Sequence, residues 1–402
     1  MYSRENLGMR NKLSLLCSIF FAVTVILYTP MPAQSAETAC IEENLARIDA
    51  LFDGYYIWLA DMYDPETGGF WYAASSKDNP DRFAPDIEST AQAFSIMRRS
   101  GLLEDMPQRM KDGLIRFIRE RQEPSGFFFD AHTDMRNVKR LRDRALSYSR
   151  SVLRSLGADP VYEYPGADNA ADSEYLSYLA TPETFRTWLD ERPWDYAWMG
   201  VDHIWSQLSV LGHLPDERKE PLLDLMFDYL ESRQDTVTGF WGGGEPYVRV
   251  SGAFKGTMIY RSQKRPIPMA DKIYGSTLHC MRTEIAEDFC WVRNPVDMMA
   301  MMKNGGIVAI PDSDIEEFVR ISVDNMSNFL KPDGGFSRGR EHSHAAPNEV
   351  ELGMGKVEGD MNAGTQAVTI REGIYRLLGR KASPLSQAPD FYSHLRDTGK
   401  IH

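Results

Sequence analysis

One turn motif occurs four times along the chain, and it constrains the fold more than any other feature of the sequence. Each copy places glycine directly before an aromatic residue; the copies are Asp64–Trp71, Glu123–Phe127, Asp235–Trp241 and Lys331–Phe336. Each follows a segment with the apolar periodicity of an amphipathic helix, at 41–63, 106–121, 217–233 and 313–330. Glycine adopts the left-handed conformation that ends a helix, and the aromatic residue after it can pack beside that helix. The repeat therefore predicts helical hairpins.

A second helix, rich in small residues, is predicted after each turn. Residues 86–93 and 360–367 match closely, because Asp, Gln and Ala fall at the same offsets and Glu88 aligns with Asn362. An Asp at such a start is a natural N-cap, and residues 202–207 resemble the same pattern. Amphipathic helices suit an outer ring, and small-residue helices suit a crowded inner ring. We therefore predict an all-α fold, an (α/α)6–7 toroid or incomplete barrel of helical hairpins, with a plain helical bundle or solenoid as the alternative.

The N-terminus resembles a secretory signal peptide. The basic residues Arg4, Arg10 and Lys12 precede an uncharged apolar run at 13–28, and small residues follow up to position 36. The run is shorter than the roughly 20 residues that span a membrane, although an uncleaved anchor is the alternative. We predict a signal peptide at 1–36, one domain at 37–402, no stable membrane insertion after cleavage, and a secreted or periplasmic protein.

The composition excludes several classes of protein. The formal net charge of −13 argues against nucleic acid as a partner. After cleavage the cysteines are Cys40, Cys280 and Cys290, so at most one disulfide can form and the fold does not depend on a disulfide framework. Whether Cys280 and Cys290 are bonded stays open. The chain has no phosphate-binding loop, dinucleotide-binding glycine pattern or zinc-type spacing, and we expect no cofactor and no metal.

The loops and helix starts on one face of the predicted ring carry the side chains best suited to chemistry. The N-termini of the inner helices would converge there, and their positive dipole ends suit an anionic ligand. Aromatic rings stack on sugars, polar groups fix hydroxyls, and cations hold carboxylates. The candidates are Glu88, His203, Trp205, Trp241, Lys255, Tyr260, Arg261, Tyr274, Arg293, Asn294 and Asn362. This set favours a cleft for an anionic polysaccharide or oligosaccharide.

Each of these side chains also has a structural interpretation. A tryptophan in such a segment is commonly part of a core, and His203 can be a buried structural histidine. The basic stretch 136–150 is interpreted as a solvated helix face rather than a binding strip. His342 and His344 have an alternating spacing but lack an evident carboxylate partner for a metal site.

The Gly-Gly-Phe turn followed by a small-residue helix resembles the repeats of terpenoid cyclases and protein prenyltransferase subunits. That resemblance covers the fold alone, because their catalytic motifs are missing. The chain also resembles the family-38 polysaccharide lyases, which are single-domain toroids acting on alginate or glucuronan. This second resemblance rests on Asp64–Trp71, Asp86–Ala93, Ser251–Tyr274 and the exported single-domain length. It would cover nearly all of the mature chain.

The lyase resemblance implies β-elimination on a uronate. The reaction needs a group that neutralises the carboxylate, a base that takes the C5 proton and an acid that protonates the O4 leaving group. We expect Tyr274 or Tyr260 to be the acid/base and His203 to assist as a base. A nearby cation, Lys255 or Arg293, would favour the phenolate and lower the phenol pKa.

The remaining candidates would bind the sugar. We expect Arg293, Asn294, Glu88 and Asn362 to neutralise or orient the uronate, and Trp241 to form a sugar platform. The acidic chain should repel a polyanion at long range. The lyase reading therefore requires a locally basic cleft, for which the candidate cations are Lys255, Arg261, Arg265 and Arg293.

Two other functions stay open. A glycoside hydrolase or sugar epimerase could use the same ring, and a hydrolase would need two opposed carboxylates roughly 5–10 Å apart. The available carboxylates are Glu88, Asp195, Asp202, Glu245 and Asp360. The third possibility is a non-catalytic glycan-binding protein. Adjacent carboxylates in one cleft would favour hydrolysis, and a cluster of Tyr, Arg and Asn would favour elimination.

Overall fold

The computed structural model describes residues 33–130, 136, 138–165, 177–212 and 214–401. The predicted signal peptide lies almost wholly outside these residues. The described part is all-helical, as predicted, and its extended segments form only isolated β-bridges. No helix in these ranges is both long enough and apolar enough to cross a membrane.

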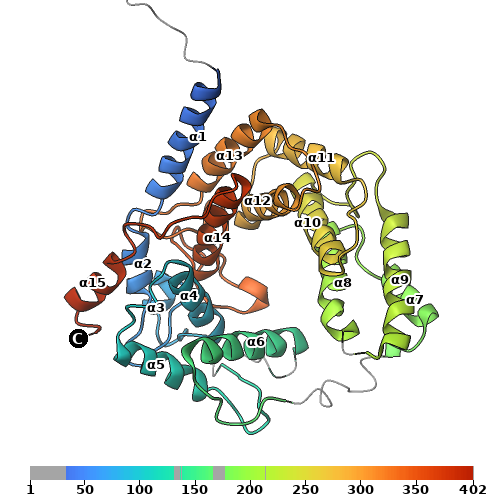
Figure 1. The fold of residues 1–402 in the computed structure, drawn as a ribbon. Coiled ribbons are helices and arrows are strands. Elements are labelled where there is room, and N and C mark those ends of the chain that lie inside the picture. Colours follow the sequence, from blue (N-terminus) through green and yellow to red (C-terminus); the bar gives the residue numbers. More distant parts are fainter. Residues whose placement is uncertain (1–32, 131–135, 137, 166–176, 213, 402) are drawn as a thin grey trace, which may run out of the picture.

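Two sets of helices alternate along the chain (Figure 1). The set that borders the central opening is α4 (Ile87–Arg99), α6 (Lys139–Leu156), α8 (Ala197–Leu211), α10 (Pro246–Ser262), α12 (Phe289–Asn304) and α14 (Met361–Leu377). The set outside it is α2 (Tyr55–Asp61), α5 (Gln108–Arg119), α7 (Pro182–Asp190), α9 (Asp216–Arg233), α11 (Ala270–Thr283) and α13 (Asp312–Ser327). The remaining helices are α1 (Ala33–Ala50), the short α3 (Ala74–Lys77) and α15 (Asp390–Asp397).

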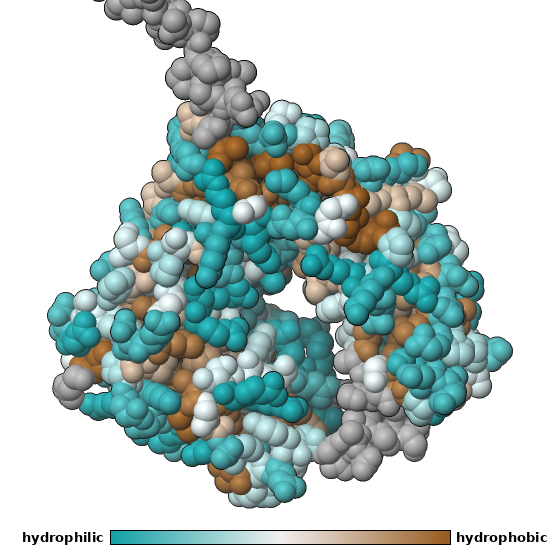
Figure 2. Space-filling model, viewed as in Figure 1, coloured by the Kyte–Doolittle hydropathy of each residue, from teal (hydrophilic) through white to brown (hydrophobic). Residues whose placement is uncertain are grey.

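The helices around the opening pack on one another in series. Helix α14 contacts both α4 and α12, α12 contacts α10, α10 contacts α8, and α4 contacts α6. Within the described part no comparable contact joins α6 to α8, the two ends of this series. Figure 2 shows that the opening passes between side chains and is bordered largely by hydrophilic residues.

The four turns of the sequence repeat share one structure. Each closes with an antiparallel bridge: Tyr63 with Phe70, Gln122 with Phe128, Gln234 with Trp241, and Leu330 with Phe336. The aromatic residue after the turn is buried, as predicted, except that the second copy buries Phe128 rather than Phe127. Each turn therefore places an aromatic ring in the hydrophobic core.

Close backbone packing explains the paired glycines of two of these turns. A side chain at Gly335 would place its Cβ 2.5 Å from Trp58 Cε2, in α2. A side chain at Gly69 would likewise lie 2.3 Å from Phe117 Cε2, in α5. The first turn thus packs against the next outer helix, and the last turn packs against the first outer helix. The end of the chain therefore meets its beginning.

The helix starts predicted at positions 86 and 360 are confirmed. Asp86 caps α4 by accepting a hydrogen bond from Ser89 N at 2.8 Å, and Asp360 caps α14 by accepting one from Ala363 N at 2.8 Å. Two other expectations differ from the structure. The segment 41–63 is divided between α1 and α2, because Gly54 has a φ of +82° at the start of α2. Residues 202–207 lie inside α8 rather than at its start.

Candidate functional site

A polar cluster lies where three chain segments meet: α4, α6 and the loop between α13 and α14. Arg144 Nη2 donates to Glu88 Oε1 at 2.5 Å and to the Tyr148 hydroxyl at 3.0 Å. Gln92 Nε2 donates to Glu88 Oε1 at 3.2 Å, and Asn348 Nδ2 donates to the same oxygen at 3.1 Å. We call these five residues the Tyr148 cluster. It brings a phenol, a guanidinium, a carboxylate and two amides together.

Local structure accounts for these positions. Arg144 and Tyr148 are four residues apart in α6, so they share one face of that helix. Glu88 lies in the first turn of α4, where the helix dipole favours a negative charge. Asn348 has a φ of +55°, a left-handed conformation that asparagine tolerates better than most residues. It belongs to the long loop between α13 and α14, which therefore reaches across to α4.

A small pocket beside this cluster is lined by both apolar and acidic residues. Leu141, Ala145, Pro347, Val350 and Leu352 line it together with Asp86, Asp130 and members of the Tyr148 cluster. Burial raises the pKa of Tyr148, and the Glu88 carboxylate raises it further, although the Arg144 guanidinium opposes both effects. The hydroxyl therefore stays protonated at neutral pH, which suits a proton donor.

Two buried carboxyl groups, those of Asp86 and Asp130, are among the groups that line the pocket. Asp130 accepts hydrogen bonds from Ile87 N at 3.1 Å and from Arg121 Nε at 3.1 Å. One oxygen of Asp86, Oδ2, has no hydrogen-bond partner among the described residues. Burial raises the pKa of Asp86, and repulsion between the two carboxylates adds to the rise. Burial also raises the pKa of Asp130, against the attraction of Arg121.

Helix α8 carries a histidine, His203, that is held in its neutral form. His203 Nδ1 lies 3.4 Å from Arg192 Nη1. Burial lowers the pKa of His203, and the positive charges of Arg192 and Arg140 lower it further, so the imidazole is neutral at pH 7. Arg140 lies one turn before Arg144 in α6. The effect of Arg140 on the pKa of His203 therefore places these two side chains within electrostatic range of each other.

Two other predicted residues border the same space. Lys255 Nζ, from α10, forms an ion pair with Asp202 Oδ1, from α8, at 2.8 Å. Arg293 Nε, from α12, forms one with Asp297 Oδ2 at 3.1 Å. Arg293 is close enough to Tyr148 to lower its pKa, which opposes the effect of burial. The structure thus gathers Glu88, His203, Lys255 and Arg293 around the opening, although both of these cations already have a carboxylate partner.

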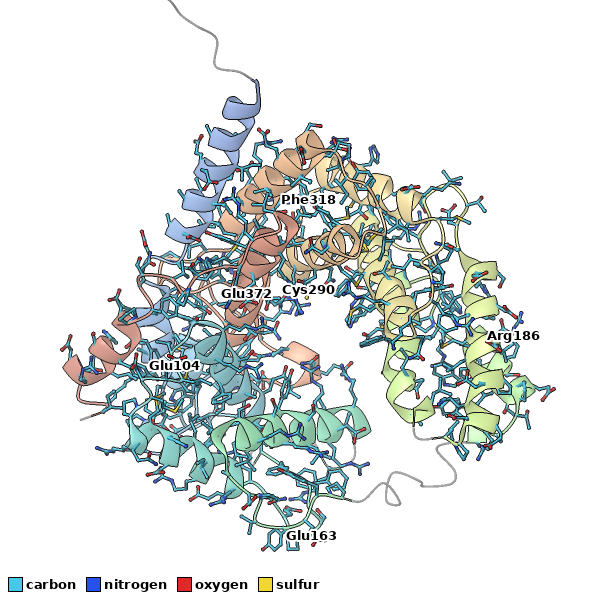
Figure 3. The ribbon with its side chains drawn as sticks, in the orientation of Figure 1. Glu104, Glu163, Arg186, Cys290, Phe318 and Glu372 are labelled. Atoms are coloured by element: carbon cyan, nitrogen blue, oxygen red, sulfur yellow. The ribbon has the colours of Figure 1, made fainter. Side chains whose placement is uncertain are left out.

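The wall formed by α12 and α14 carries a second polar group. Arg338 Nη1 donates to Asn362 Oδ1 at 3.1 Å, and Arg338 Nε donates to Asp288 Oδ1 at 2.7 Å. Cys290 lies nearby at the edge of the opening (Figure 3), and burial raises its pKa to about 11. Cys40, Cys280 and Cys290, the cysteines of the described part, are all free thiols. Cys280 and Cys290, whose pairing could not be decided from the sequence, are therefore not joined by a disulfide.

The structure corrects the expected roles of two aromatic residues. Trp241 is fully buried and donates through Nε1 to Leu230 O at 2.9 Å, so it has no face for a sugar. Tyr260 is 1% exposed, packs against Trp241 and Phe227, and its hydroxyl has no hydrogen-bond partner in the described ranges. Both side chains belong to the core between α9 and α10, where a substrate has no access.

Other candidates lie away from the opening or inside the ring wall. Tyr274 is in the outer helix α11, where its hydroxyl donates to Asp314. Arg261 lies in the last turn of α10 and donates to Met301 O at 3.3 Å. Asn294 is buried and donates to Ser251 Oγ at 3.0 Å, and Trp205 is a half-buried residue of α8 packed against the core.

The basic cleft expected from four cations is only partly present. Lys255 and Arg293 border the opening, whereas Arg261 and Arg265 lie elsewhere; Arg265 is paired with Asp224. The basic stretch 136–150 is more than a solvated face, because Arg144 turns toward Glu88. Arg144, Tyr148 and Asn348 are therefore site residues that were not expected from the sequence. The spacing of Arg144 and Tyr148 was visible in the sequence, but nothing there indicated that α6 would turn this face toward α4.

The chain matches no known protein family, and a comparison with curated proteins also gives no match. No group of three or more His, Cys, Asp and Glu side chains in the described part of the chain is placed to hold a metal ion.

Proposed function

We propose that the alternating helices form an incomplete (α/α)6 toroid. The serial packing of the inner helices supports this arrangement. The last turn, at Gly335, packs on α2 in the way the first turn packs on α5, which supports a cyclic repeat that returns to its start. The break lies between α6 and α8. A solenoid would instead keep the first and last repeats apart.

We propose that the chain is an exported polysaccharide lyase that cleaves a uronate-containing polymer, of the alginate or glucuronan type, by β-elimination. The observation that carries this proposal is the Tyr148 cluster, in which a protonated phenol, a guanidinium and an asparagine meet on the wall of the opening. A neutral histidine, His203, lies within electrostatic range of Arg140 on the helix that carries the phenol. The export itself rests on the N-terminal sequence.

The residues divide the reaction among them. His203 takes the C5 proton, the electron pair of that C–H bond forms the C4–C5 double bond, and the C4–O4 bond breaks. Tyr148 gives its proton to the departing O4. Arg144 and Arg293 stabilise the negative charge that develops on the carboxylate during proton removal. Tyr148 thus replaces Tyr260 and Tyr274 in the assignment, because neither of those hydroxyls borders the opening.

The acidic chain does not attract an anionic polymer at long range, so binding of the polymer depends on local contacts. A net charge of −13 repels a polyanion at a distance. At 0.15 M salt the Debye length is about 8 Å, so a ligand inside the opening interacts mainly with the side chains beside it. The enzyme should therefore bind its polymer more tightly as ionic strength rises from very low values.

The test uses a panel of alginate, glucuronan, pectate and glycosaminoglycans with the purified mature chain. Elimination creates a double bond conjugated to the carboxylate, and its ultraviolet absorbance is followed together with the release of reducing ends. Tyr148→Phe should lower turnover at least about a hundredfold. Tyr274→Phe serves as the matched change on an outer helix and should stay within about threefold. Full activity in Tyr148→Phe would refute the assignment of the acid.

A glycoside hydrolase on the same ring is the second candidate. Glu88 of α4 and Asp202 of α8 both act electrostatically on Arg144, which supports a pair of carboxylates on either side of it. Such a pair could serve as acid and base for hydrolysis. New reducing ends without absorbance would favour this function over elimination. A flat trace by both assays would leave glycan binding without catalysis.

A further inference from the structure

The sequence repeat produces a second polar cluster on α14, which packs directly against α4. Asn362 occupies the position in α14 that Glu88 occupies in α4. Its Oδ1 accepts hydrogen bonds from Gln366 Nε2 at 2.7 Å and from Arg338 Nη1 at 3.1 Å. Glu88 accepts in the same way from a glutamine one turn later and from an arginine. The two clusters therefore share one plan on adjacent helices.

The chemistry of the second cluster differs because an amide replaces the carboxylate. Both donors converge on Asn362 Oδ1, and this fixes the orientation of the amide. The opposite group, Nδ2, carries two N–H bonds and donates to no acceptor among the described residues. Gln366 adds an unpartnered acceptor, because it is 5% exposed and its Oε1 has no hydrogen-bond partner in the same ranges. Buried polar atoms without a partner are uncommon in proteins and call for an explanation.

Arg338 is held rigidly beside this amide. Its backbone N–H donates to Asp360 Oδ2 at 2.6 Å, and its Nε donates to Asp288 Oδ1 at 2.7 Å. Its Nη2 donates to no acceptor in the described part, and the side chain is 22% exposed. A guanidinium fixed in place loses little conformational entropy when it binds an oxygen ligand. Asp288 already balances its charge, so the cluster offers directed donors rather than a net positive field.

We propose that Arg338, Asn362 and Gln366 form a second sugar subsite for the unit next to the one that reacts at the Tyr148 cluster. Arg338 and Asn362 donate to the carboxylate of that unit, and Gln366 accepts a hydrogen bond from one of its hydroxyls. Packed helices lie about 8–10 Å apart, so one short oligosaccharide reaches both clusters. This inference rests on the proposed function, and it makes the substrate a chain of consecutive uronates rather than a single terminal unit.

Asn362→Asp is the sharpest variant, because the carboxylate keeps an acceptor for Gln366 and Arg338 but has no N–H to donate. We expect it to raise KM for the uronate polymer at least about tenfold, with a smaller effect on kcat. Thr365→Val is the matched control on the same helix, since the Thr365 hydroxyl is already satisfied by Met361 O at 3.2 Å. The control should change KM less than twofold. An unchanged KM in Asn362→Asp would overturn the proposal.

Binding measured without cleavage separates this inference from the proposed reaction. Calorimetric titration of the Tyr148→Phe chain with a uronate tetramer should show binding, and adding Asn362→Asp should weaken it at least about tenfold. Equal affinity with and without Asn362→Asp overturns the subsite alone, whereas no binding of any uronate oligomer overturns the function as well. Gln366→Met repeats the test if circular dichroism shows that Asn362→Asp does not fold, and it should weaken binding at least threefold.

Discussion

Replacing Asp86 with asparagine should stabilise the protein, and the gain should grow with pH. The Asp86 carboxyl caps α4 through one oxygen, whereas its Oδ2 is buried without a partner in the described part of the chain. Burial and the neighbouring Asp130 raise its pKa above the ordinary value of 3.8. An asparagine keeps the oxygen that caps the helix and places an N–H₂ group where the unpartnered oxygen lies. No capping bond is lost.

The sign and the size of the effect follow from proton linkage. A raised folded-state pKa gives stability that is fully present below pH 3.8 and is lost as pH rises through the folded-state value. Between those limits the wild type loses about 1.4 kcal/mol per pH unit relative to a residue that cannot ionise. From pH 4.5 to pH 6 the advantage of Asp86→Asn in the free energy of unfolding should therefore grow by about 2 kcal/mol.

Asp360→Asn is the control at the repeat-related cap. Both oxygens of Asp360 accept backbone hydrogen bonds, from Ala363 N and from Arg338 N. An amide nitrogen there would face an N–H donor and leave it unsatisfied, which costs about 1–3 kcal/mol. Urea unfolding at pH 4.5 and pH 6 measures both variants. Burial raises the pKa of Asp360 as well, to about 6, so the pH trend alone does not separate the two variants. The reasoning is refuted if the difference between Asp86→Asn and wild type is the same at both pH values, or if Asp360→Asn is as stable as Asp86→Asn at either pH.

The pH profile of kcat/KM should be flat between about pH 7 and pH 9.5, because the pKa of His203 is lowered from 6.5 and that of Tyr148 is raised from 10. A sharp optimum inside this range would contradict the assignment of His203 as the base and Tyr148 as the acid. Gly335→Ala should destabilise the chain by at least about 2 kcal/mol, since its Cβ would lie 2.5 Å from Trp58. Gly275→Ala in α11 meets nothing within 4 Å, so it should stabilise the chain by about 0.5–1 kcal/mol. Thermal unfolding of both variants checks this ordering. Tyr260→Phe removes a buried hydroxyl that has no hydrogen-bond partner among the described residues. Urea unfolding should therefore show no loss of stability, and the rate assay should show no loss of activity. A large loss of activity without a loss of stability would mean that Tyr260 takes part in the reaction.

The sequence determined the hairpins and their caps. The glycine-aromatic turns appear where the repeat places them, because a left-handed glycine and a buried ring are local requirements that neighbouring residues satisfy. Asp86 and Asp360 cap helices for the same reason. The helical class of the fold followed from these local signals alone.

Only the tertiary structure decided which side chains meet. Trp241 and Tyr274 had the residue types of a sugar site, but one is in the core and the other is on an outer helix. Arg144 and Asn348 lie 204 residues apart in the sequence, and both donate to Glu88 because α6 and the α13–α14 loop pack on α4. The periodicity of a helix shows that it has an inner face, but the direction in which that face turns depends on the neighbours against which it packs.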